Sequence, residues 1–141
     1  GSEMCIRDSS MADQVLAVYK QVKPDLTAIE NTVRGRNRST QRILEFLHKE
    51  VLELLRDENA KLVYLDPSEW RAALEVRLSK DDKKNNRMVY QGKKRGKVTK
   101  KHLSVRMANA LCGLDLILKH NDIADSICLG LAAHKIYAVG K

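Results

Sequence analysis

The sequence predicts an α/β fold that is rich in helices and contains one short pair of parallel strands. Two observations support this prediction: two short apolar runs have the length of strands, and five longer segments have the apolar spacing of helices. A helical segment separates the two strands, and strands joined in this way pair in parallel through a right-handed crossover. The 141 residues are enough for one domain with a single core.

The N-terminal half supplies both strands. Residues 1–10 have no apolar period, so they are set aside as a tag-derived or disordered leader, and the domain is expected to span residues 11–141. The helix expected over 11–22 carries Val15, Val18 and Val22 on one face. After it we expect, in order, a strand over 26–29 that ends at Glu30, a polar loop over 31–38, a helix over 39–56 capped by Ser39 or Thr40, and a strand over 61–65.

Three helices are expected in the C-terminal half. The first starts with Asp66 as its N-cap and Pro67 in its first turn, and Trp70, Leu74 and Leu78 share one face. The second opens at Thr99, and the third runs from about Asp122 to Tyr137. The residues expected to point inward from these two helices are Leu103, Met107, Leu111, Leu114, Leu118, Ile123, Ile127 and Leu131. We expect Trp70 to be a packing anchor, and Cys112 and Cys128 to be small core residues.

The net charge of +8 is concentrated in one segment, residues 79–101. This segment also holds Gly92 and Gly96 and is expected to be a flexible basic loop. Its ten cations are Lys80, Lys83, Lys84, Arg87, Lys93, Lys94, Arg95, Lys97, Lys100 and Lys101. Only Asp81 and Asp82 oppose them. Such a stretch suits contact with a nucleic-acid backbone, and a solvated loop is the alternative.

The amino-acid composition argues against several classes of protein. An aromatic content of 4% argues against a platform that stacks bases, and no apolar run reaches the roughly 18 residues of a membrane span. The three cysteines lack the spacing of a zinc site or a disulfide framework, and the N-terminus has no secretory signal. An intracellular, cytoplasmic protein is therefore expected.

Most acidic residues of the chain are expected on solvated, polar helix faces, but three lie at other positions. Glu30 ends an apolar strand at the carboxyl edge of the predicted sheet, where α/β folds place their sites. Asp122 and Asp125 share one face at the start of an apolar helix. Hard oxygen ligands of this kind suit Mg²⁺ or Mn²⁺. The alternative is that the two aspartates simply favour the positive end of their helix.

Three motifs resemble one family of nucleases. They are the Lys23–Glu30 strand, the Val63–Arg71 strand with its Asp-Pro-Ser-Glu-Trp-Arg helix start, and the His120–Leu131 helix with its Asp-Ile-Ala-Asp-Ser run. In this order, with helices between them, they resemble the RuvC-type Holliday-junction resolvases of the RNase H-like superfamily, and above all their phage and viral relatives. The resemblance covers Met11 to about Tyr137.

The resemblance implies an RNase H-like fold and an endonuclease that cleaves four-way DNA junctions as a homodimer with two Mg²⁺ ions. Glu30, Asp122 and Asp125 match three of the family's four metal-binding carboxylates, and the basic loop would contact DNA. Lys119 and His120 lie beside the acids and could steady a phosphate or position water, or they are ordinary helix-end cations.

The strand that carries the family's first catalytic Asp has no counterpart before Glu30, and Asp8 has no room after it for the hairpin that follows in the family. A fold that is incomplete at its N-terminus, with weak or no activity, is therefore expected. Two alternatives stay open: a nucleic-acid-binding module without catalysis, and a helical interaction protein whose loop is merely solvated and whose acids are caps.

Overall fold

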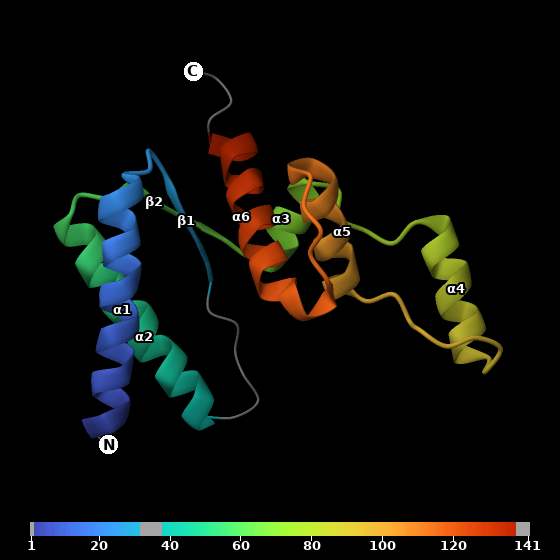
Figure 1. Cartoon of the computed structure of the whole chain (residues 1–141), viewed down its shortest axis with the longest axis horizontal. Helices are drawn as coiled ribbons and strands as arrows, with labels where there is room; N and C mark the ends of the chain where they lie inside the picture. The colour runs from blue at the N-terminus through green and yellow to red at the C-terminus, as the bar shows by residue number, and fades with distance from the viewer. Residues whose placement is uncertain (1, 32–37, 138–141) are drawn as a thin grey trace. The chain divides into compact units, whose positions relative to one another are not determined.

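The computed structural model describes residues 2–31 and 38–137. The chain forms two compact units, Gly1–Tyr64 and Leu65–Lys141, and each has its own packed helices (Figure 1). The chain is 67% helical, and its two strands pair in parallel. The prediction of a helix-rich chain with one short parallel strand pair is therefore confirmed.

Two helices pack together in the first unit, α1 (Ser2–Val22) and α2 (Arg38–Asp57). Ala12 and Leu55 are almost fully buried. The valine face predicted for the first helix is not its packed face, because Val15, Val18 and Val22 are 42%, 58% and 64% exposed. Helix α2 begins at Arg38, so Ser39 and Thr40 lie within its first turn and not before it.

The sheet is formed by β1 (Thr27–Glu30) and β2 (Leu62–Leu65). The backbone N–H of Thr27 donates to the carbonyl of Lys61 at 2.9 Å, which fixes the register where the strands begin. Both predicted strands are confirmed to within one residue. Of the loop expected over 31–38, residues 32–37 lie outside the described residues.

The second unit opens with α3 (Pro67–Ala73), and its predicted start is confirmed. Asp66 is the N-cap, and its backbone N–H donates to Oε1 of Glu69 at 3.0 Å. The helix is shorter than predicted, because Leu74 caps it and Glu75 takes a left-handed backbone with φ of +55°. Leu78 therefore does not continue the face of Trp70 and lies in the link that leads to the next helix.

Helix α5 (Lys100–Cys112) begins at the predicted cap, Thr99, but ends earlier than predicted. Gly113 adopts φ of +64°, a conformation that glycine reaches without strain. The Asn109 side chain then bonds both backbone groups of Leu116, donating to its carbonyl at 3.0 Å and accepting from its N–H at 2.9 Å. These bonds replace a further helical turn, so Leu111, Leu114 and Leu118 are exposed and not inward as predicted.

A short 3₁₀ turn, η1 (Leu118–His120), leads into α6 (Asn121–Tyr137), and α6 packs against α3 and α5. The buried residues of α6 are mostly small: Ala124, Cys128, Ala132 and Ala133, with Leu129 as the one large side chain among them. The prediction that Ile123 faces inward is wrong, because Ile123 is 52% exposed.

The two cysteines of this unit differ in burial. Cys128 is a core residue as predicted, and its thiol lies 3.7 Å from the carbonyl of Ser104. Cys112, the last residue of α5, is exposed, so the prediction that it is a core residue is wrong.

Candidate nucleic-acid interface and metal-ligating carboxylates

The basic segment over residues 79–101 is largely ordered, so the prediction of a flexible loop is wrong. Its first half is a helix, α4 (Lys80–Tyr90), and the rest returns along the chain to the start of α5. Helix α4 projects from the packed helices α3, α5 and α6 (Figure 1). We call residues 79–101 the basic arm.

The base of the arm is held by Asp82, which is only 7% exposed. Its carboxylate accepts the backbone N–H of Ser79 at 3.0 Å, and the Ser79 hydroxyl accepts the N–H of Asp82 at 3.1 Å. One guanidinium nitrogen of Arg106, on α5, donates to both carboxylate oxygens at 2.9 and 3.0 Å. This pair ties α4 to α5, because the two residues lie on different helices.

Two asparagines of α4 hold the returning half of the arm. Asn86 donates to the carbonyl of Val98 at 3.0 Å and accepts the N–H of Val98 at 2.8 Å. Asn85 donates to the carbonyl of Gly96 at 2.9 Å. The two halves of the arm therefore run side by side. Hydrogen bonds of side-chain amides join them, and not a β-sheet.

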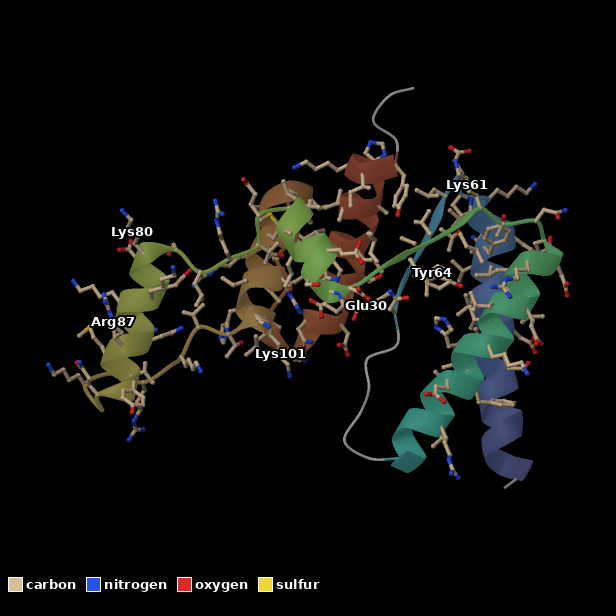
Figure 2. All side chains as sticks on the ribbon, turned by 180° about the vertical axis from the view of Figure 1, so that it is seen from behind. Glu30, Lys61, Tyr64, Lys80, Arg87 and Lys101 are labelled. Carbon is tan, nitrogen blue, oxygen red and sulfur yellow. The ribbon has the colours of Figure 1, made fainter. Side chains whose placement is uncertain are left out.

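The ten predicted cations of the arm are all exposed. Figure 2 shows Lys80 and Arg87 extending from α4, and Lys101 in the first turn of α5. Since Arg106 partners Asp82, Asp81 is the one acid of the arm that faces solvent. The arm is therefore an exposed cationic surface with a defined backbone.

Acidification is expected to loosen the arm. The Ser79 backbone N–H and the Arg106 guanidinium lower the pKa of Asp82 below its ordinary value. The stabilisation is therefore complete above the unfolded-state pKa of about 4, and it is lost as the pH falls through the lower folded-state pKa. Protection of the amides of residues 80–90 against hydrogen exchange, followed from neutral to acidic pH, measures this loss.

A matched pair of variants isolates the effect. Asp82→Asn should reduce the protection of α4 at neutral pH and remove its dependence on acidification. Asp81→Asn makes the same change of charge at an exposed neighbour and should behave as the wild type. Equal protection of α4 in the wild type and in Asp82→Asn at pH 7 would contradict this role of Asp82.

Tyr90 is a residue of this surface that sequence analysis missed. It is 94% exposed and shares one helical face with Lys83 and Arg87, beside a hollow of about 650 Å³. The aromatic content of the whole chain, 4%, gives no indication of a single exposed ring on this surface. The signal in the sequence was the position of Tyr90, at the end of a run of cations.

The three predicted carboxylates lie in different surroundings. Glu30, the last residue of β1, is half-buried and belongs to the first unit. Asp122 is exposed in the first turn of α6, and its Oδ1 accepts from the side-chain amide of Asn121 at 3.2 Å. Asp125 is half-buried, and its Oδ1 is buried without a hydrogen-bond partner.

These surroundings separate two explanations for the aspartates. Asp122 lies in the first turn, where the positive end of a helix stabilises an acid, so its position by itself does not require a metal. Asp125 lies beyond the first turn, and a buried carboxylate oxygen without a donor is costly. A bound cation or an ordered water would satisfy this oxygen, and capping does not.

Asp125 also acts on its neighbour in the core. Burial, and next the negative charge of Asp125, raise the pKa of the Cys128 thiol to about 11. Cys128 is therefore a protonated thiol at neutral pH, in keeping with its place in the core.

The remaining predicted site residues have ordinary structural surroundings. Lys119 is exposed, and His120 accepts the backbone N–H of Ile117 through Nδ1 at 3.2 Å, so both belong to η1. Asp8 lies in helix α1 and not in a strand. Across residues 2–31 and 38–137, no three His, Cys, Asp or Glu side chains form a group that could hold a metal ion.

Comparison with models of protein families, with curated protein sequences and with solved structures found no match. In the part of the chain that the structure describes, no helix has both the length and the apolar character to cross a membrane.

Proposed function

We propose that this chain binds branched DNA through its basic arm and acts as a Mg²⁺-dependent endonuclease on four-way junctions. The observation that carries the proposal is the arm itself, with ten exposed cations on an ordered backbone. A cationic surface of this kind gains affinity for DNA by releasing counterions from the phosphates. An intracellular location, expected from the cysteines, is part of the same proposal.

The carboxylates support the catalytic half of the proposal. Asp122 and Asp125 project from successive turns of α6, and Asp125 has a buried oxygen that lacks a donor. Both are hard oxygen ligands, which fit Mg²⁺ or Mn²⁺. The family resemblance implies Glu30 as a third carboxylate ligand. Such ions, when bound, activate water and stabilise the leaving oxygen in phosphodiester hydrolysis. The homodimer implied by the family resemblance would present two such sites to a symmetric junction.

A second function, binding of nucleic acid without catalysis, is supported by the way the arm is fastened. The contacts of Asp82, Asn85 and Asn86 hold it without any part played by Glu30, Asp122 or Asp125. An arm of this kind would bind DNA whether or not the acids hold a metal.

A cleavage assay on a synthetic four-way junction and a linear duplex, with Mg²⁺ or EDTA, separates the two functions. Asp125→Asn should lower the junction-cleavage rate at least about 100-fold and leave binding unchanged, because losing even an outer-shell partner of a metal costs roughly 10–100-fold. Glu30→Gln should behave alike. The matched control is Asp115→Asn, an exposed aspartate of the second unit.

Each outcome selects one function. Metal-dependent nicking of the junction, lost in Asp125→Asn and kept in Asp115→Asn, would support the nuclease. Tight binding without nicking would support the binding module. Nicking that Asp125→Asn retains would refute the assignment of this residue, and no binding of either DNA would refute both functions.

A further inference from the structure

A second hollow of the C-terminal unit combines an apolar wall with a cationic rim. Its volume is about 870 Å³, within the usual range for sites that take small ligands. It lies where the link after α3, the returning half of the basic arm, the start of α5 and η1 meet. The apolar side chains that line it are Val76, Leu78, Val98, Leu103 and Leu118. We call it the rim cavity.

The rim of this cavity selects for an anion. Its cations include Arg71, Arg77, Lys97, Lys100 and Lys101, and the described residues that line it include no carboxylate. Nε of Arg71 is buried and has no hydrogen-bond partner. The guanidinium of Arg71 lies 4.8 Å from the centre of the Trp70 ring, which fixes its position. The rim therefore offers positive charge to an anionic group, and Arg71 has one N–H donor that is not in use.

The polar side chains Asn86 and Thr99 of the cavity wall already form hydrogen bonds within the protein. The Asn86 amide bonds both backbone groups of Val98, and the Thr99 hydroxyl lies 2.8 Å from Nδ1 of His102. The cavity therefore offers apolar surface and positive charge, with few groups that could read the edge of a base. The complementary ligand has a flat apolar body and an attached phosphate, which is the chemistry of a nucleotide.

We propose that the rim cavity holds one unpaired nucleotide of the bound DNA, without regard to its sequence, with the base against the apolar wall and its phosphate at the rim. This rests on the proposed DNA-binding function, because Lys97, Lys100 and Lys101 belong to both the basic arm and the rim. A base inside a duplex cannot enter the cavity, so the nucleotide must be unpaired.

The test compares a fully paired four-way junction with the same junction carrying one unpaired 2-aminopurine nucleotide at the branch. The wild type should bind the second about tenfold more tightly, the effect of removing about 55 Å² of apolar surface from water. It should also quench the fluorescence of 2-aminopurine. Binding is measured by anisotropy at fixed salt.

Leu118→Glu places a negative charge on the wall at a residue that is 43% exposed, and it should abolish the tenfold preference and the quenching. The control Ile117→Glu makes the same change of charge at the adjacent residue, which is 54% exposed and lies outside the lining, and it should keep both. Arg77→Ala, at a rim side chain that is 79% exposed, should reduce the preference without any effect on folding.

Equal affinity of the wild type for the two junctions would overturn the cavity proposal and leave the proposed function standing. The cavity proposal would also be overturned by a preference that survives Leu118→Glu, or by one that Tyr90→Ala removes and Leu118→Glu does not. Failure to bind either junction would overturn the proposed function, and the nucleotide site with it.

Discussion

The affinity of this protein for DNA is expected to fall about 10³-fold or more when the salt concentration rises from 50 to 200 mM. The ten cations of the basic arm are all exposed, and Asp81 is the one acid of the arm that Arg106 does not partner. Each phosphate contact contributes a slope of about −0.9 in a plot of log affinity against log salt. Six such contacts are enough for the stated loss.

A triple variant of α4 tests whether the arm is the source of this dependence. Lys83→Gln, Lys84→Gln and Arg87→Gln together remove three exposed cations, and they should reduce the size of the slope by about 2.7, which is three times 0.9. The measurement is a titration of a fluorescent four-way junction at several salt concentrations.

The matched control removes three exposed cations from α2, in the first unit, through Arg42→Gln, Lys49→Gln and Arg56→Gln. Both variants lower the net charge by three. The control should leave the slope unchanged if the arm contacts DNA. Equal slopes for the two triple variants would mean that overall charge, and not the arm, draws the protein to DNA.

Replacing Trp70 by Ala is expected to lower the free energy of unfolding of the second unit by about 3–5 kcal/mol. The Trp70 side chain is fully buried, and it lies on α3, which packs against α6. The loss is large beside the total stability of a typical domain, about 5–15 kcal/mol. Thermal and urea unfolding followed by circular dichroism measure it.

Two control variants test whether the loss of stability comes from removing a buried ring. Trp70→Phe retains an aromatic ring in the core and should lose less stability than Trp70→Ala. Tyr90→Ala removes an aromatic side chain that is 94% exposed, and it should change stability by no more than about 0.5 kcal/mol. If Trp70→Ala unfolds like the wild type and loses only DNA binding, Trp70 is a contact residue and not the packing anchor of α3.

Local signals predicted the starts of α3 and α5, but not those of α2 and α4, although the Ser79–Asp82 capping box that begins α4 is also local. Asp66, Pro67 and Glu69 start α3, and Thr99 caps α5, as the sequence indicated. Capping depends on side chains within three residues of one another, so no distant contact is needed to predict it. The two strands and the concentration of positive charge are also visible in neighbouring residues, so no distant contact is needed to predict them.

The sequence predicted less accurately which helical side chains are buried. Val15, Leu111 and Ile123 follow helical spacing and yet are exposed. Four of the five buried residues of α6 are small (Ala124, Cys128, Ala132 and Ala133), and apolar periodicity gives small residues little weight. A periodic pattern indicates that a helix has an apolar side, but the partner helix decides which residues become buried.

Some features of the candidate site were also predictable from the sequence, and others were not. The sequence placed Asp122 and Asp125 together at the start of one helix, and α6 confirms that placement. The unpartnered oxygen of Asp125 and the exposure of Tyr90 depend on what packs around them, so only the structure revealed them.

The sequence by itself determined the helix-rich character of the chain, the strand pair and the location of the positive charge. The tertiary structure decided that the charged segment is an ordered arm and not a loop. The deciding contacts join residues far apart in the chain: Asn86 bonds Val98 twelve residues later, and Asp82 bonds Arg106 twenty-four residues later. Each contact closes a loop of the chain at a cost in conformational entropy, and no local pattern in the sequence shows whether the contact repays it.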